Sequence, residues 1–355
     1  MQNRINNLRR EMAKIGAEAA YITSPVSHRY LTGIDNPDGI LIITEKQAYA
    51  LEDFRYIEIA EATLSHVYTV MELKRSGIYD TLKEILTGEG VSYLAFEDTE
   101  MSVAEFNALN SNTEATLVGL GGRIKKLREV KTPEEVAEIA EAQRITDLAF
   151  EKLLEVLSPQ MTENDVAAEL EYLMRKNGAE DKSFETIAIS GKRSSMPHGA
   201  PTGNRLCKGF LTMDFGAVVK GYHSDMTRTV CIGKADEEMK KLYNTVLRAQ
   251  RDALDFIKSG VPCSEADKVA RDIIYKDYKG CFGHSLGHGV GLQIHEGPNL
   301  SPMSTGILTP GNVVTVEPGI YIAGKYGCRI EDMVLIEDGT LRNFTKSPKE
   351  LIEIY

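Results

Sequence analysis

The sequence lacks four features that would each assign a protein to a broad class. It has no apolar run of roughly 18 residues, which argues against a membrane-spanning helix. It has no excess of basic residues, since its formal net charge is -11, and this argues against a nucleic-acid partner. Its five cysteines include no C-x-x-C pair, and its N-terminus has no signal-peptide core. The sequence therefore predicts free thiols and a reducing cytoplasm.

The 355 residues present are enough for two or three domains. Short strands and helices alternate in the first part, which predicts a small α/β domain over residues 1–128. The expected strands cover 17–23, 39–44 and 46–52, and the expected helices cover 56–62 and 76–86. The glycine-rich and basic stretch LVGLGGRIKKLREV predicts the connection to a second domain, 129–355.

Helix signals divide the second domain into two similar blocks. Thr132 and Glu135 form a capping-box pattern, and Thr162 is followed by Asp165 in the same way. Two more helices are expected, one over 236–259 and one from Ser264. In each block two helices precede a histidine-bearing stretch and a pair of strands. This order predicts an α+β domain with an internal pseudo-twofold repeat.

Four acidic residues occur in apolar, β-branched segments that resemble buried strands. They are Asp214 in LTMDFGAVV, Asp225 in YHSDMTRTVCI, Glu317 in VVTVEPGIYI and Glu331 in RIEDMVLI. A buried carboxylate costs several kcal/mol unless it is paired or bound to a cation. Structural ion pairs would explain one such residue. Four of them, with His288 in GHSLGHGVG between the two pairs, favour a shared cation.

Spacing predicts that the two aspartates converge but leaves the glutamates open. The odd separation of Asp214 and Asp225 suits a hairpin with a two- or four-residue loop, which directs both carboxylates to one face. The even separation of Glu317 and Glu331 needs an odd loop or a bulge, and Pro318-Gly319 interrupts regular pairing there.

The ligand types predict a metal-dependent hydrolase. Four carboxylates and one imidazole suit Mn²⁺, Co²⁺ or Zn²⁺ and argue against copper or an iron–sulfur cluster. Five ligands are natural for two ions about 3.5–4 Å apart, which together activate water and polarise a carbonyl group. A cysteine nucleophile at Cys281, near His284, is the alternative, and nothing else around Cys281 supports it.

These segments resemble the metal-binding motifs of the pita-bread metallopeptidases, which include methionine aminopeptidase, Xaa-Pro aminopeptidase and Xaa-Pro dipeptidase (prolidase). All five ligand positions match in type and order. The preceding domain resembles the creatinase-type N-terminal domain, with SHRYLTG and EDFRY among the matching pieces. The resemblance covers nearly the whole chain and implies a pita-bread catalytic domain after a creatinase-like α/β domain.

The resemblance also implies a role for each site residue. Asp225 and Glu331 would bridge two ions, Asp214 would bind one of them, and His288 and Glu317 would bind the other. The expected catalytic residues are His198, His295 and Glu317, the last as a proton shuttle. The expected substrate-binding residues are His284, Tyr321 and Arg329.

The favoured function at this point is an Xaa-Pro aminopeptidase that acts on short proline-containing peptides. We expect it to use two divalent ions, with manganese favoured over cobalt or zinc, and to form a homodimer. The alternative is an Xaa-Pro dipeptidase. A metal-free creatinase-like enzyme and a non-catalytic binding protein are more remote, because such relatives lack the full ligand set.

Overall fold

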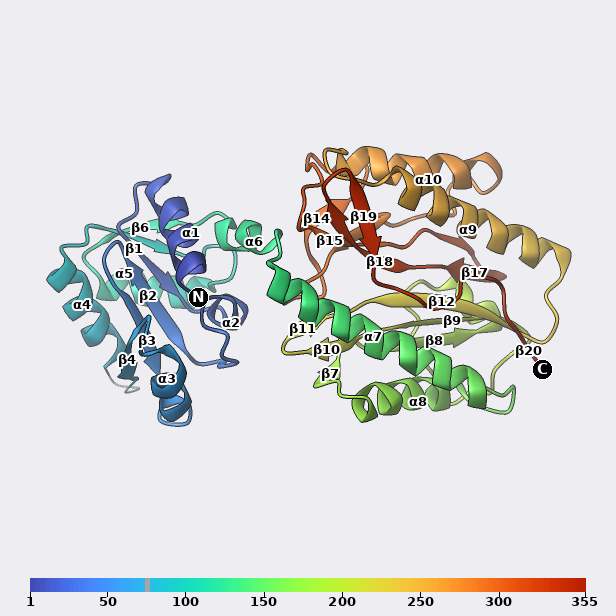
Figure 1. Cartoon of the computed structure of the whole chain (residues 1–355), viewed down its shortest axis with the longest axis horizontal. Coiled ribbons are helices and arrows are strands. Elements are labelled where there is room, and N and C mark those ends of the chain that lie inside the picture. Colours follow the sequence, from blue (N-terminus) through green and yellow to red (C-terminus); the bar gives the residue numbers. More distant parts are fainter. Residues whose placement is uncertain (74–76) are drawn as a thin grey trace. The chain divides into compact units, whose positions relative to one another are not determined.

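The computed structural model describes residues 1–73 and 77–355. These residues form two compact units, Met1–Arg128 and Glu129–Tyr355 (Figure 1). In the parts of the chain that are described, no helix is long and apolar enough to cross a membrane. All five cysteines are free thiols, as the sequence predicts.

The first unit is built on a six-stranded mixed sheet with the order β4-β3-β2-β1-β5-β6. The strands are β1 Ala19–Ile22, β2 Ile40–Thr44, β3 Ala48–Glu52, β4 Thr69–Glu72, β5 Tyr93–Phe96 and β6 Thr116–Gly119. The helices are α1 Gln2–Ala13, α2 Pro25–Thr32, α3 Ile57–Leu64, α4 Ile78–Glu89, α5 Val103–Asn112 and α6 Arg123–Arg128. The three predicted strands and the helix at 56–62 are confirmed. The helix predicted over 76–86 is α4, and residue 76 lies outside the described residues.

The second unit contains two blocks of two helices and a sheet. In the first block, α7 Pro133–Val156 and α8 Glu163–Lys176 accompany β8 Ile187–Ser190, β9 Gly209–Phe215 and β12 Met226–Ile232. In the second, α9 Glu237–Phe256 and α10 Cys263–Asp277 accompany β13 Gly287–Gly289, β14 Glu296–Leu300, β15 Val313–Val316, β18 Asp332–Glu337 and β19 Thr340–Asn343. β20 Glu353–Ile354 completes the first sheet, whose order is β20-β12-β9-β8, and the second has the order β14-β13-β15-β18-β19.

Each block has its own apolar core between helices and sheet. Phe150, Leu170 and Phe215 belong to the first core, and Leu242, Ala270 and Val334 belong to the second. The two cores confirm the predicted α+β domain with an internal repeat.

The helix starts follow the sequence signals in three of four cases. Thr132 and Thr162 both form complete capping boxes, and Asp236 caps α9. The prediction for Ser264 is wrong, because α10 begins one residue earlier, after Pro262. Asp267 is buried instead of capping the helix, and its carboxylate accepts hydrogen bonds from Arg271.

Small hairpins extend both acid-bearing strand pairs. β10 Ala217–Val219 and β11 Tyr222–His223 lie between β9 and β12, and β10 also pairs with β7 Asp181–Lys182. β16 Gly319–Ile322 and β17 Tyr326–Arg329 lie between β15 and β18. A 3₁₀ helix, η1 Gly191–Ser195, precedes His198. These extensions determine where each carboxylate leaves its sheet.

Candidate metal centre

The aspartates share one face because the β9–β12 hairpin keeps its register to its tip. Asp214 pairs with Thr227, so Asp225 is two positions away on the same face. The tip is the two-residue turn Lys220-Gly221, and both residues have positive φ, 46° and 77°. This geometry is typical of a type I′ turn, which glycine favours. The predicted convergence through a two-residue loop is confirmed.

The two glutamates lie opposite each other because of a strand register that their sequence spacing alone did not predict. Val316 pairs with Asp332 in one sheet, and Gly319 pairs with Arg329 beyond Pro318. Because both pairings have the same register, Glu317 and Glu331 lie directly opposite each other. The loop at the tip has three residues, 323–325, which fits the odd loop that an even separation requires.

Three of the four acids flank strands instead of lying within them, contrary to the expectation of buried strand positions. Asp225 precedes β12, Glu317 follows β15, and Glu331 precedes β18. Asp214 alone lies inside its strand, β9. At the strand ends the backbone leaves the sheets, and the carboxylates can therefore meet between them.

His288 lies on the short strand β13, not on a helix, between two glycines that allow close packing. A Cβ atom at Gly287 would lie 2.0 Å from the Thr315 carbonyl oxygen, and one at Gly289 would lie 2.1 Å from the Gly297 carbonyl oxygen. The His288 Nδ1–H donates to the Gly289 carbonyl oxygen at 3.0 Å. This bond leaves Nε2 as the ligand atom of the neutral ring.

The ligand atoms of Asp225, His288 and Glu331 all lie within 4.8 Å of one another. His288 Nε2 is 3.5 Å from Asp225 Oδ2 and 3.4 Å from Glu317 Oε1. Asp214 lies outside this tight group, and its Oδ2 is paired with Arg329 at 2.7 Å. The structure thus brings all five predicted ligands to one site, where Asp214 is paired with the Arg329 guanidinium.

The carboxylates carry more negative charge than the neighbouring protein groups balance. Burial raises the pKa of Asp225, Glu317 and Glu331, and the neighbouring carboxylates raise the pKa of Asp225 and Glu331 further. Among the described residues, Asp214 Oδ1, Asp225 Oδ1 and Glu331 Oε1 are buried without a hydrogen-bond partner. Buried unpaired oxygens of this kind fit oxygen-preferring divalent cations. The donor set therefore fits a metal site.

Two threonines that sequence reasoning missed orient the ligands. The Thr227 hydroxyl donates to Glu331 Oε2 at 2.7 Å and accepts from Arg329 Nε at 2.9 Å. The Thr315 hydroxyl donates to Glu317 Oε1 at 3.1 Å and accepts from the His288 backbone N–H at 3.1 Å. Hydroxyl side chains in a strand are common, so the sequence carried no signal for these roles.

The site opens into a cavity of about 710 Å³. His198, His284 and His295 line it beside the acids, and the His295 ring packs edge-on against His288 with centroids 4.4 Å apart. Burial lowers the pKa of His295. The apolar part of the wall also escaped prediction and consists of Phe184, Ile187, Pro197, Pro201 and Ile294.

Arg329 connects the acids to the other predicted substrate-side residues. Its guanidinium donates to the Tyr321 hydroxyl at 2.7 Å, and that oxygen lies 3.0 Å from His284 Nε2. His284 Nδ1 donates to the Ser285 carbonyl oxygen. Burial, assisted by Arg329, lowers the pKa of His284 to about 3, and burial raises that of Tyr321 to about 12. Tyr321 lies behind Arg329 and is not among the residues that line the cavity.

Comparison with known proteins agrees with this geometry. The model of metallopeptidase family M24 matches residues 137–338, and the creatinase/prolidase N-terminal domain matches residues 4–130. An Xaa-Pro dipeptidase of Pyrococcus furiosus is 36% identical over 99% of this chain and 100% of the relative.

Two solved structures extend the likeness to three dimensions. The Xaa-Pro dipeptidase from Bacillus anthracis has a TM-score of 0.96 at 39% identity, and the alignment covers 99% of each chain. An X-Pro aminopeptidase from Thermotoga maritima has a TM-score of 0.90 at 35% identity and covers 97% of this chain and 100% of that one. The chain therefore belongs to metallopeptidase family M24 and has a creatinase/prolidase N-terminal domain followed by a pita-bread catalytic domain.

Proposed function

We propose that the protein is an Xaa-Pro dipeptidase that uses two divalent metal ions. The observation that carries the proposal is the group of buried, partnerless carboxylate oxygens beside His288 Nε2 at the base of a cavity. The cavity volume of about 710 Å³ lies in the range usual for small-ligand sites. Its apolar wall beside charged groups suits a short peptide that contains proline.

The ligand roles follow the resemblance and the positions of the side chains. Asp225 and Glu331, which belong to different sheets, would bridge both ions. Asp214 would hold one ion, and His288 and Glu317 would hold the other. When bound, such an ion pair lowers the pKa of a water molecule and polarises a carbonyl oxygen.

The cavity residues account for the remaining chemistry. Glu317 lines the cavity beside His288, so its carboxylate can carry a proton from the attacking water to the departing imino nitrogen. His198 and His295 line the same cavity and can donate hydrogen bonds to the carbonyl oxygen as charge develops on it. Arg329 and His284, joined through Tyr321, form the substrate-side wall.

Dipeptidase activity replaces aminopeptidase activity as the favoured function. The relatives from Pyrococcus furiosus and Bacillus anthracis are both named Xaa-Pro dipeptidases. The relative from Thermotoga maritima is named an X-Pro aminopeptidase and has a lower TM-score than the Bacillus anthracis protein. The aminopeptidase expected from the sequence is thus less well supported than its alternative.

A substrate panel tests the proposal. An Xaa-Pro dipeptide, the matching Xaa-Pro-Yaa tripeptide and an Xaa-Ala dipeptide are compared at equal concentration with Mn²⁺, Co²⁺ or Zn²⁺ added to chelator-treated protein. We expect hydrolysis of the Xaa-Pro dipeptide alone and the highest rate with Mn²⁺. Preferential cleavage of the tripeptide would restore the aminopeptidase assignment, and hydrolysis without any metal would contradict the metal centre.

Two further parts of the account stay predictions. The first is the homodimer, which the resemblance to the creatinase-type domain implies. The second is the domain boundary, with the creatinase-type domain over 1–128 and the catalytic domain over 129–355. Sedimentation analysis of the full chain tests the dimer.

A further inference from the structure

The predicted ligands come from two different sheets, so their spacing depends on how these sheets are joined. Asp214 and Asp225 belong to the β9–β12 hairpin, and Glu317 and Glu331 belong to the β15–β18 hairpin. At the level of the ligands, the Glu331 backbone N–H donates to the Thr227 carbonyl oxygen at 3.1 Å. A group that secures this junction would set the distance between the aspartates and the glutamates.

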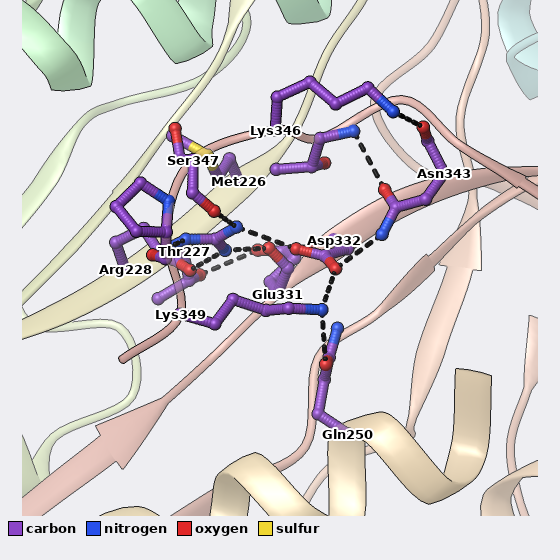
Figure 2. A network of polar contacts seen from close by, with 12 residues as sticks. Met226, Thr227, Arg228, Gln250, Glu331, Asp332, Asn343, Lys346, Ser347 and Lys349 are labelled. Carbon is purple, nitrogen blue, oxygen red and sulfur yellow. Dashed lines mark hydrogen bonds and ion pairs between the residues drawn. The ribbon is translucent and has the colours of Figure 1, made fainter. Parts of the chain in front are cut away.

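Arg228 occupies this junction, beside Thr227, Glu331 and Asp332 (Figure 2). It is the largest fully buried side chain among the residues that the structure describes. Its Nη1 donates to the carbonyl oxygens of Thr227 and Glu331, at 3.0 and 2.6 Å. One guanidinium nitrogen therefore bonds the backbone of β12 and that of Glu331, the residue directly before β18 and itself a predicted bridging ligand.

Asp332 balances the charge of Arg228 from the other strand. Its Oδ1 accepts from Arg228 Nη2 at 2.8 Å, and its Oδ2 accepts from Lys349 at 2.6 Å and from Asn343 at 2.7 Å. The carboxylate is thus held from one side by Arg228 and from the other by Lys349 and Asn343.

The C-terminal segment closes the network. Arg228 also donates to the carbonyl oxygens of Ser347 and Pro348, at 2.9 and 3.0 Å. Lys349 Nζ also donates a hydrogen bond to Gln250 Oε1 on α9, at 3.0 Å (Figure 2). Strands of both sheets, a helix and the C-terminal segment therefore meet on one buried ion pair.

We propose that Arg228 and Asp332 form a clasp that fixes Glu331 relative to Asp225, so that both carboxylates can hold the same two ions. The clasp rests on the proposed two-metal function. Arg228 hydrogen-bonds the backbone of Thr227 and Glu331 and is therefore a positioning residue that acts through these two residues. Lysine would retain the charge opposite Asp332, but it lacks the planar fork that donates to several acceptors at once.

The test measures metal binding by the full-length protein, independently of turnover. Chelator-treated parent, Arg228→Met and Leu170→Ala proteins are titrated with Mn²⁺ by calorimetry, and the electron paramagnetic resonance signal of the coupled ion pair is recorded. Leu170→Ala is the matched control, because Leu170 is a fully buried side chain of the first core and lies on α8, which carries none of the hydrogen-bond partners of Arg228 or Asp332 described above. We expect Arg228→Met to bind one ion but to bind the second about 10–100-fold more weakly, and to lose the coupled signal.

The outcomes separate positioning from general loss of stability. Leu170→Ala should bind two ions as the parent does, even when its unfolding temperature falls as far as that of Arg228→Met. Equal loss of affinity in both variants, or parent-like binding by Arg228→Met, overturns the clasp. If Arg228→Met does not fold, Arg228→Lys takes its place with the same expectation. A parent that binds no ion pair contradicts the proposed function and the clasp together, whereas parent-like Arg228→Met beside a two-ion parent contradicts the clasp alone.

Discussion

Gly216 provides a sharp test of how closely the aspartate hairpin must be built, because it leaves no room for a side chain. A Cβ atom there would lie 1.9 Å from the Ser224 carbonyl oxygen and 2.9 Å from the Ser183 Cβ. A carbon–oxygen contact of about 3.3 Å requires these backbones to separate by more than about 1 Å. Ser224 directly precedes Asp225, so the Gly216→Ala change displaces a predicted bridging ligand.

The size of the effect follows from this displacement. A misplacement of about 1 Å can cost roughly 100-fold in rate, or about 2.7 kcal/mol of transition-state stabilisation. We therefore expect kcat/KM for an Xaa-Pro dipeptide to fall about 100-fold in Gly216→Ala, with overpacking also costing about 1–3 kcal/mol of stability. Kinetics are measured well below the unfolding temperature, with Mn²⁺ content determined on the same samples.

Gly203→Ala is the matched control, because an added Cβ at Gly203 meets nothing within 4 Å. This variant should retain the kcat/KM of the parent. If Gly216→Ala folds and stays within about threefold of the parent, the required displacement does not reach the ligands, and the reasoning from close packing is wrong.

Three further variants test single interactions of the site. Thr227→Val removes the 2.7 Å bond to Glu331, and calorimetry should show metal affinity reduced about 10–100-fold; unchanged affinity would contradict this role. Glu331→Gln should abolish turnover, yet the chelator-treated variant should gain stability over the parent in urea unfolding as the pH rises above 4.5. The reason is that the raised pKa of the Glu331 carboxyl group in the folded state makes its ionisation cost the parent stability as the pH rises. A difference in unfolding free energy that does not change with pH would refute this. His284→Gln should have a lower free energy of unfolding than the parent above pH 6.5, and this difference should narrow as the pH falls toward 3. The reason is that the folded state keeps the His284 imidazole neutral, so the parent loses stability once the unfolded chain is protonated below pH 6.5. A difference that widens in acid would contradict this.

The extent of sequence-based prediction differed between the two acid pairs for a physical reason. A hairpin with a two-residue turn has one register, so the spacing of Asp214 and Asp225 was enough to place them on one face. The pairing of Glu317 with Glu331 passes from one sheet to another across Pro318, and its register depends on packing that no local pattern records.

The supporting residues were beyond prediction because their roles arise from tertiary contacts. Thr227, Thr315 and Arg228 occur in ordinary alternating strand sequence, and Arg228 gains its partners where β12 meets Glu331, Asp332 and the C-terminal segment. Ser264 shows the converse error, since a good capping residue lies inside a helix whose start is set by Pro262 and by the burial of Asp267.

The most direct test of a two-metal dipeptidase combines metal content with substrate length. Full-length protein loaded with Mn²⁺ is analysed for bound metal and, in the same preparation, for kcat/KM on an Xaa-Pro dipeptide and its Xaa-Pro-Yaa extension. We expect two ions per chain and hydrolysis of the dipeptide, with little or no cleavage of the tripeptide. A protein that holds no ion pair, or that cleaves the tripeptide in preference to the dipeptide, would contradict it.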